Sequence, residues 1–251
     1  MDEWLVLEQI AKIRMDRPGE YLFREITAQV EPGQRIAILG TSGQGKSTLL
    51  RILARLDTQS EGAIRLAGRE ARDWKPAEWR RRIGYVAQQP VMLPGTVEMN
   101  LKAASDLHGK PFNRDLAERC MDAAGLGGLD WRKLAGELSG GEKQRTALVR
   151  SMLLEPEAML LDEVTSALDP ASKRAVERLL GEWSEQRGTA LLWVTHDLEQ
   201  ARLGCDTVWF MADNRLLEAG PAPAFFRAPA TEKAREFVRS LHAEGRSAGH
   251  V

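Results

Sequence analysis

The chain has 251 residues, 43% of them hydrophobic and 28% charged, so it can bury the core of one large domain or of two closely packed subdomains. Its 35 Lys and Arg residues nearly cancel its 36 Asp and Glu residues, which excludes a bulk positive field that would recruit nucleic acid or anionic lipid. The start does not resemble a signal peptide and no apolar run approaches the roughly 18 residues of a membrane span, so a membrane role is expected to need a partner.

The N-terminal third is predicted to be rich in β-structure. Alternating apolar positions predict strands at residues 4–14 and 26–30, and the apolar run 35–39 predicts a third strand. Helical spacing predicts a helix over residues 47–56. Further strands are expected at residues 63–66 and 83–87.

The pattern changes at about Pro90. Residues 96–155 are predicted to be mostly helical, with Asn113 and Ser139 as N-caps, and we interpret them as a helical subdomain inserted into the sheet. Cys120 falls in this part and Cys205 follows later; both are interpreted as buried thiols in a reducing compartment.

The C-terminal half alternates strands with helices. Strands are predicted at residues 158–161, 190–195, 207–211 and 215–217, with a helix from Pro170 to Gly181 or beyond between the first two. This order implies right-handed crossovers and a mainly parallel sheet. We expect an amphipathic helix over residues 231–242 and a loose tail over residues 245–251.

These elements predict a single α/β domain over residues 1–251. We assign the catalytic core to residues 1–89 and 156–222, the helical subdomain to residues 90–155, and a C-terminal helix and tail to residues 223–251. The core is expected to combine N-terminal antiparallel strands with a mainly parallel sheet.

A glycine-rich segment between a predicted strand and a predicted helix fits the pattern G-x-x-x-x-G-K-[ST]. Its glycines would let backbone N–H groups surround phosphate oxygens, and Lys46, a cation at a helix N-terminus, makes better sense beside an anion. The Ser47 hydroxyl would bind Mg²⁺. A glycine-rich turn that matches by chance is the alternative. The residues assigned to nucleotide binding here are Gly40, Thr41, Ser42, Gly43, Gln44, Gly45, Lys46, Ser47 and Thr48.

Polar side chains follow three other predicted strands. Asp162 and Glu163 come directly after residues 158–161, and Gln88 and His196 follow their strands in the same way. Carboxyl ends of parallel strands share one edge, so these side chains and the phosphate loop can line one crevice. We expect Asp162 to bind Mg²⁺ and Glu163 to act as general base toward water. The alternative is that these residues are ordinary surface or capping groups.

The segment Leu138-Ser-Gly-Gly-Glu142 opens the helix that leads to the Asp162 strand. Two successive glycines weaken a helix start by about 1 kcal/mol each, without an obvious packing gain. They expose backbone N–H groups that an anion can bind. A purely structural Gly-Gly turn is the alternative.

The order of these motifs closely resembles that of the nucleotide-binding subunits of ABC transporters. The resemblance runs from about residue 5 to residue 220 and includes Leu160-Leu-Asp-Glu163 and Ser166-Ala-Leu-Asp169. It implies a P-loop ATPase fold of the ABC type with ATP and Mg²⁺ as cofactors. It also implies a head-to-tail dimer with a second copy, in which Ser139, Gly140 and Gly141 face the γ-phosphate held by the other copy.

The same resemblance implies further roles. Asp169 would contact the opposite copy, His196 would touch the γ-phosphate, and Gln88 would bind Mg²⁺ and couple it to movement of the helical subdomain. Residues 89–96 would lie near the groove that receives a short helix of the membrane subunit. The implied partners are integral membrane permease subunits, with no nucleic acid, at the cytoplasmic face of the cell membrane.

The sequence around these motifs is most similar to that of bacterial ATPases of iron export. ATPases of phosphate or polar amino-acid importers are the alternative. Relatives that act on nucleic acid or ribosomes carry long insertions between Gln88 and Leu138, whereas Leu138 here lies 50 positions after Gln88. A non-hydrolysing scaffold is disfavoured because Glu163 and His196 are both intact.

One position departs from the family pattern. Members usually carry an aromatic ring that stacks on adenine, and our alignment places Met15 there. A thioether can pack on a base, although some of the roughly 1–3 kcal/mol of aromatic stacking would be missing. The alternative is that Met15 is an ordinary core or strand residue and that Tyr21 or a neighbour does the stacking.

Overall fold

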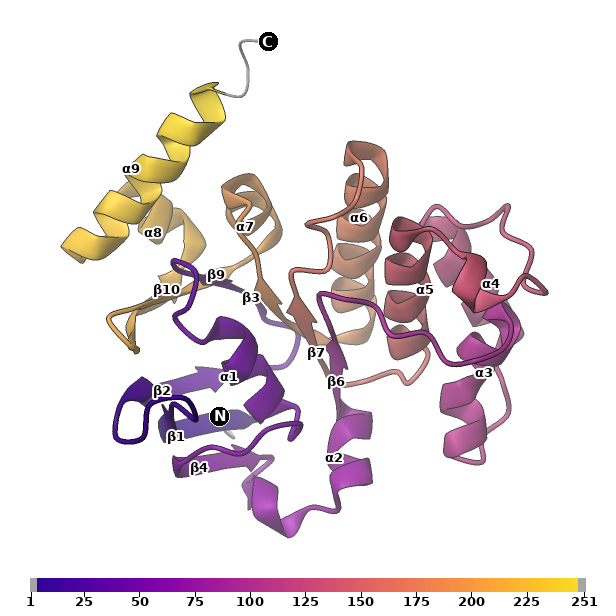
Figure 1. Cartoon of the computed structure of the whole chain (residues 1–251), viewed down its shortest axis with the longest axis horizontal. Coiled ribbons are helices and arrows are strands. Elements are labelled where there is room, and N and C mark those ends of the chain that lie inside the picture. The colour runs from indigo at the N-terminus through magenta and orange to yellow at the C-terminus, as the bar shows by residue number, and fades with distance from the viewer. Residues whose placement is uncertain (1–3, 248–251) are drawn as a thin grey trace.

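The computed structural model describes residues 4–247 and contains two β-sheets with helices around them (Figure 1). The first sheet is antiparallel, with the strand order β2-β1-β4-β5, and β1 and β2 contribute side chains such as Leu5, Leu7 and Phe23 to the core. Its strands are β1 (Leu5–Ile13), β2 (Tyr21–Val30), β4 (Glu61–Leu66) and β5 (Arg69–Glu70). The predicted antiparallel opening is confirmed.

The second sheet has the strand order β10-β9-β3-β8-β7-β6, and only its β9–β10 pair is antiparallel among the described residues. Every residue of β7 and β8 is buried, as is typical of parallel strands covered on both faces. The mainly parallel sheet was therefore predicted correctly. Its strands are β3 (Arg35–Leu39), β6 (Ile83–Val86), β7 (Ala158–Asp162), β8 (Ala190–Val194), β9 (Thr207–Ala212) and β10 (Arg215–Pro221).

Most helices lie where hydrophobic spacing predicts them. They are α1 (Lys46–Leu53), α2 (Pro76–Arg82), α3 (Val97–Leu107), α4 (Arg114–Ala123), α5 (Gly140–Met152), α6 (Pro170–Arg187), α7 (Leu198–Gly204), α8 (Ala222–Arg227) and α9 (Glu232–Ser247). Asn113 and Ser139 cap α4 and α5, as predicted. Helices α3, α4 and α5 gather on the side of β6 away from the N-terminal sheet (Figure 1). The subdomain boundaries at residues 89, 156 and 222 stay a prediction.

Two expectations need correction. Helices α2, α7 and α8 were not predicted, because each has only six or seven residues and too few buried positions to reveal a helical repeat. The prediction of a loose tail from residue 245 is wrong for residues 245–247, since α9 continues to Ser247 through a run that includes Ala243, Glu244 and Arg246, which favour helix. Residues 248–251 lie outside the described part of the chain.

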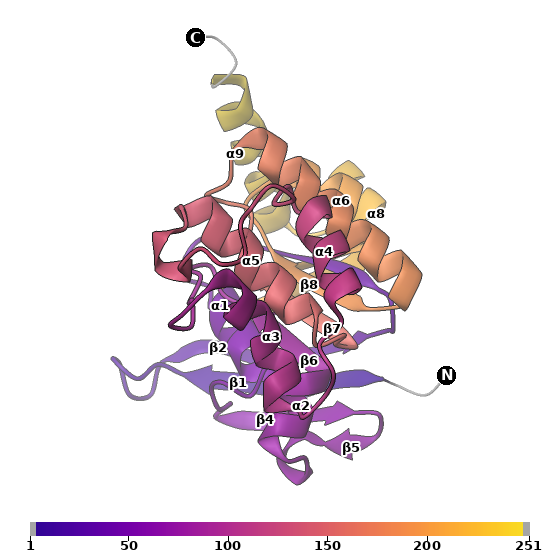
Figure 2. The same ribbon diagram turned by 90° about the vertical axis from the view of Figure 1, so that its right-hand side faces the viewer.

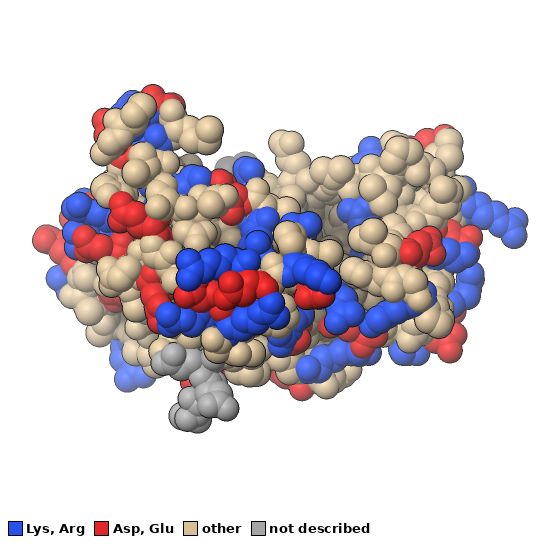
Figure 3. Space-filling model, turned by 90° about the horizontal axis from the view of Figure 1, so that it is seen from below, with Lys and Arg blue, Asp and Glu red and all other residues tan. Residues whose placement is uncertain are grey.

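Other sequence predictions concern thiols, membrane spans and charge. Cys120 and Cys205 are buried free thiols as expected, and burial raises their pKa values to about 11 and about 12. No helix within residues 4–247 is long and apolar enough to cross a membrane. Basic and acidic side chains are interspersed on the face seen in Figure 3, in agreement with the balanced composition.

Trp79 of α2 anchors the packing between α1 and the edge of the parallel sheet. Its side chain is fully buried in the cluster that contains residues of β1, β3 and β7, and its Nε1 donates to the Leu53 carbonyl oxygen at 2.8 Å. Trp74 meets it edge to face, with ring centroids 6.3 Å apart. The indole therefore fills the core and also satisfies a carbonyl group at the end of α1.

We expect Trp79→Ala to lower the free energy of unfolding by about 3–5 kcal/mol, because it leaves a cavity and an unpaired carbonyl group. Urea unfolding followed by circular dichroism measures this. Leu203→Ala, which truncates a side chain that is 69% exposed, is the control and should change stability by less than about 0.5 kcal/mol. Equal stability of the two variants would contradict the assigned role.

Candidate functional site

The phosphate loop joins β3 to α1 and needs glycine at two positions for steric reasons. Gly40 has a φ of +142°, and a Cβ atom there would lie 2.1 Å from the Met211 carbonyl oxygen. Gly45 has a φ of +84°, and its Cβ would lie 2.7 Å from Cδ1 of Phe23. The loop is thus packed against β9 and β2, while Thr41, Ser42 and Gly43 remain exposed.

Lys46 is buried with only 6% of its surface exposed, and its Nζ donates to the carbonyl oxygens of Gly40 at 2.7 Å and Thr41 at 2.9 Å. Burial lowers the pKa of Lys46, and the nearby charges of Glu163 and Asp162 oppose that shift. Among residues 4–240, whose side chains the structure describes, no carboxylate forms an ion pair with Lys46, and the first turn of α1 contains no acid. A buried cation held only by carbonyl groups at a helix N-terminus fits a phosphate ligand.

Asp162 ends β7 and is held by two hydroxyl groups. Its side chain is almost fully buried; Oδ1 accepts from Ser47 Oγ at 2.8 Å and Oδ2 accepts from the Tyr85 hydroxyl at 2.9 Å. Sequence reasoning missed Tyr85, although a tyrosine inside an apolar strand is a signal that its hydroxyl has a polar partner. A hydroxyl and a carboxylate are donors that suit Mg²⁺ together with phosphate oxygens, so Ser47 and Asp162 fit the metal.

Glu163 follows Asp162 and lies between Gln88 and His196. Gln88 Nε2 donates to Glu163 Oε2 at 2.8 Å, and His196 Nε2 lies 2.9 Å from Glu163 Oε1. The Glu163 side chain is 17% exposed and that of His196 is 48% exposed. Glu163 also has a φ of +49°, a left-handed conformation of the kind that clusters at functional sites. The structure therefore brings together three polar residues that the sequence analysis expected at one edge of the sheet.

The segment that leaves Gln88 is fastened to α3 and α5. Asn100 is fully buried, and its side chain accepts from the Leu93 N–H at 2.8 Å and donates to the Leu93 carbonyl at 3.0 Å. Arg150 of α5 donates to the Val91 carbonyl at 2.7 Å and to Asn100 Oδ1 at 2.8 Å. Sequence reasoning missed both residues. Gln88 thus connects the Glu163 cluster to the helical part of the chain.

Ser139, Gly140 and Gly141 lie at the start of α5, away from the phosphate loop. Ser139 and Glu142 form a capping box, with the Glu142 N–H donating to Ser139 Oγ at 3.2 Å and the Ser139 N–H donating to Glu142 Oε2 at 2.8 Å. Figure 1 shows α5 and α1 on opposite sides of β6 and β7. No hydrogen bond among the described residues joins this segment to the loop of the same chain.

Asp169 is exposed and caps α6, accepting from the N–H groups of Ala171 and Ser172, both at 3.0 Å. Hydrogen bonding from the Ser172 side chain, followed by that from the Ser172 and Ala171 N–H groups, lowers the pKa of Asp169. The segment before it lies beside the start of α5, where a Cβ on Gly141 would be 3.4 Å from Leu168. Asp169 and the Ser139 segment therefore belong to one exposed region.

Met15 lies between β1 and β2 and is 91% exposed, so the alternative that it is a core or strand residue is wrong. Tyr21 begins β2, and its hydroxyl donates to Glu61 Oε1 at 2.7 Å. Neither the Tyr21 ring nor the Met15 thioether is buried by contacts within the chain.

A cavity of about 380 Å³ lies beside Tyr21. The other residues that line it are Arg14, Glu20, Arg24, Asp213 and Asn214. The Asn214 N–H donates to Gln44 Oε1 at 3.2 Å, which ties one wall of the cavity to the phosphate loop. Met15 does not line it. The cavity is therefore a candidate place for the base of a nucleotide whose phosphates occupy the loop.

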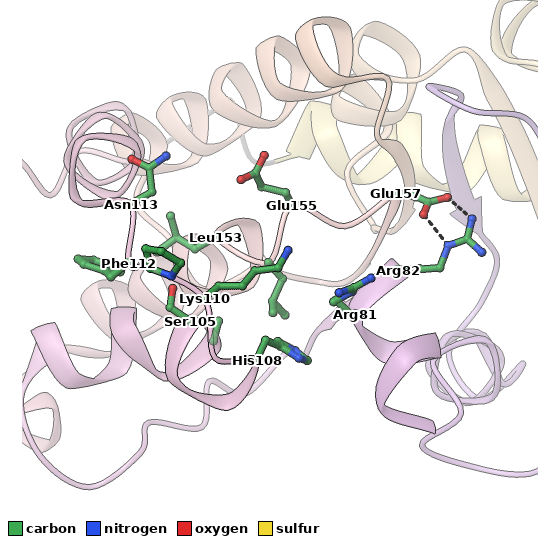
Figure 4. A pocket seen from close by; sticks show the side chains of 13 residues that line it. Arg81, Arg82, Ser105, His108, Lys110, Phe112, Asn113, Leu153, Glu155 and Glu157 are labelled. Carbon is green, nitrogen blue, oxygen red and sulfur yellow. Dashed lines mark hydrogen bonds and ion pairs between the residues drawn. The ribbon is translucent and has the colours of Figure 1, made fainter. Parts of the chain in front are cut away.

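Another cavity, of about 300 Å³, lies between α2, the end of α3 and the turn before β7 (Figure 4). Arg82 and Glu157 form an ion pair on one wall, with Arg82 Nη2 2.7 Å from Glu157 Oε2, while His108 and Lys110 stand on the other. This cavity shares no residue with the cluster around Asp162 and Glu163. It is not part of the candidate site.

Comparisons with known proteins agree with this geometry. Residues 23–166 match the family model described as ABC transporter. YjkB of Bacillus subtilis (strain 168), whose name describes an ABC transporter ATP-binding protein, is 38% identical over 218 residues, 87% of this chain and 86% of the relative. The methionine import ATP-binding protein MetN of Pasteurella multocida (strain Pm70) is 36% identical over 242 residues, 93% of this chain and 70% of the relative.

Among solved structures, a bacterial Atm1-family ABC exporter with ATP bound superposes with a TM-score of 0.82 at 24% identity. The match covers 94% of this chain but only 41% of the exporter chain, so it bears on the fold of the shared part. The loop, the paired acids and the sequence matches agree with one another, and the chain belongs to the ABC transporter family as an ATP-binding subunit with ATPase activity.

Proposed function

We propose that the chain binds and hydrolyses Mg-ATP as a head-to-tail dimer and thereby powers a separate integral membrane permease at the cytoplasmic face of the cell membrane. The observation that carries the proposal is the meeting of Lys46, Asp162 and Glu163 in one cluster while Ser139 and Gly140 stand exposed elsewhere. One chain therefore supplies the part of the phosphate site that contains Lys46, Asp162 and Glu163, and the start of α5 does not join it.

The residues of the cluster have distinct roles in this proposal. Lys46 and the N–H groups of the loop bind the β- and γ-phosphates, and Ser47 and Asp162 hold Mg²⁺, which supplies charge neutralisation when bound. Gln88 donates through Nε2 to Glu163, which leaves its amide oxygen free for the metal. Glu163 accepts a proton from the attacking water, and His196 orients Glu163 and touches the γ-phosphate.

The need for a second copy follows from the start of α5. Gly140 and Gly141 present backbone N–H groups at a helix N-terminus, a position that attracts anions. In this proposal the γ-phosphate that they bind belongs to another protomer, because the start of α5 lies away from the chain's own loop (Figure 1). Asp169 lies on the same exposed region and would contact that protomer as well.

The transported solute is a separate part of the proposal. We infer a metal exporter, with iron as the cargo, from the local sequence similarity described above; import of phosphate or a polar amino acid is the alternative. A relative named for phosphate import supports that alternative, whereas a relative named for methionine import agrees with it only in the direction of transport. Identification of the permease that co-purifies from native membranes distinguishes the two. Action on nucleic acid is disfavoured by the balanced charge.

The dimer predicts Mg-dependent ATPase activity that rises more steeply than linearly with protein concentration, approaching second order well below the dimerisation constant. Initial rates of phosphate release across a dilution series measure this. Lys46→Ala, which lacks the phosphate-binding cation, serves as the control for contaminating ATPases. Strict proportionality in a preparation that stays monomeric with ATP would contradict the proposal.

Glu163→Gln should retain ATP binding and lose about 10²–10⁴-fold of turnover, because the amide cannot accept a proton from water. The variant should also accumulate an ATP-stabilised dimer visible by size-exclusion chromatography. Asp130→Asn, which neutralises an exposed acid outside the cluster, should hydrolyse ATP like the wild type. Near wild-type turnover by Glu163→Gln would assign the base to another residue.

Met15 as the base contact predicts that Met15→Tyr tightens ATP binding by up to about 1–3 kcal/mol and leaves turnover at saturation largely unchanged. Hydrolysis of GTP by the wild type should approach that of ATP. If Tyr21 already stacks on adenine, Tyr21→Ala should lose affinity and Met15→Tyr should gain none. The affinity of both variants for a fluorescent ATP analogue, measured by titration, distinguishes these two alternatives.

A further inference from the structure

We propose that Tyr85 is a positioning residue for magnesium: its hydroxyl holds the Asp162 carboxylate in the orientation that the metal requires. The inference rests on the proposed Mg-ATP function and adds a residue that no sequence motif assigned. It concerns how the metal is held, rather than whether the chain binds it.

The two strands that carry these residues are neighbours. Tyr85 of β6 pairs with Leu160 of β7, two positions before Asp162. The phenol therefore reaches along the sheet to the carboxyl end of β7, where its oxygen lies 2.9 Å from Asp162 Oδ2. Both partners are fixed by the parallel ladder, so the contact does not depend on a mobile loop.

Asp162 divides its two oxygens between two elements. Ser47 of α1 donates to Oδ1 at 2.8 Å, and Tyr85 of β6 donates to Oδ2. With only 4% of Asp162 exposed, water does not replace either donor readily. A carboxylate that is held at both ends cannot rotate about its Cβ–Cγ bond, so Oδ1 stays turned toward Ser47, the other residue assigned to the metal.

Tyr85 acts through Asp162 and not as a ligand. A tyrosine hydroxyl carries its proton at neutral pH, so the phenol is the donor in its 2.9 Å contact with Asp162 Oδ2. Partners of this kind, which hydrogen-bond a metal ligand without touching the metal, set the orientation of the ligand and typically change metal affinity by about 10–100-fold. Removal of the hydroxyl should therefore change the Mg²⁺ concentration at which nucleotide binding is half-saturated.

A purely structural role makes a different prediction. If Tyr85 only satisfies a buried carboxylate, loss of its hydroxyl lowers the stability of the protein and leaves the magnesium requirement unchanged. If the phenol competes with the metal for Asp162, its loss lowers the magnesium requirement. Only the positioning role raises it.

The experiment uses Tyr85→Phe, which keeps the ring and deletes the hydroxyl. Binding of a fluorescent, non-hydrolysable ATP analogue is titrated with MgCl₂, and the half-saturating Mg²⁺ concentration should rise roughly tenfold. Binding of the same analogue in EDTA should not change. Thermal unfolding without ligand reports the structural contribution separately.

Thr189→Val is the matched control because it deletes another buried hydroxyl, whose Oγ1 donates to the Pro156 carbonyl oxygen at 3.1 Å outside the cluster. It should destabilise the protein without changing the Mg²⁺ titration. An unchanged or lower Mg²⁺ requirement in Tyr85→Phe overturns the inference about Tyr85 alone. Absence of Mg-dependent ATP hydrolysis in the wild type would instead overturn the proposed function.

Discussion

Parallel pairing of β3, β8, β7 and β6 is the constraint on which the site depends. It aligns the carboxyl ends of these strands, so the segments that leave them deliver the phosphate loop, His196, Asp162 and Gln88 to one edge of the sheet. Residues far apart in sequence thereby come within hydrogen-bond distance, as for Gln88 and Glu163 at 2.8 Å. The sheet is a rigid frame, because β7 and β8 are buried along their whole length.

The buried charges of Lys46 and Asp162 at this edge are satisfied by neutral partners. Lys46 donates to carbonyl oxygens, Asp162 accepts from hydroxyl groups, and Glu163 lies between an amide and an imidazole. Direct pairing of Lys46 with a carboxylate would have cancelled the charges that bind phosphate and metal. The neutral partners instead stabilise each buried charge and leave its field available to a ligand. We regard this as the electrostatic basis of the proposed ATP site.

The remaining groups of the site are built on the helical part of the chain. Asn100 and Arg150 hold the segment after Gln88 against α3 and α5, and the start of α5 carries Ser139 and Gly140. A movement of these helices relative to the sheet would therefore shift Gln88 and the exposed glycines together. In the proposed dimer this connection would link the state of the nucleotide to the position of these helices.

The sequence by itself determined the features that depend on local chemistry and spacing. The glycine-rich loop before Lys46, the acids after an apolar strand, and the caps Asn113 and Ser139 could all be predicted, because each depends on residues close together in the chain. The parallel sheet and the grouping of Gln88, Glu163 and His196 followed from the order of the elements.

Only the tertiary structure decided the contacts between distant residues that have no spacing signature. Strand register and helix packing decide these contacts. They include the hydrogen bond from the Tyr85 hydroxyl to Asp162, the hydrogen bond from Arg150 to the Val91 carbonyl oxygen, and the burial of Trp79. The exposure of Met15 depends equally on which way the β1–β2 connection leaves the sheet. These features come from three-dimensional neighbours, and a local pattern of side chains does not by itself reveal which neighbours will meet.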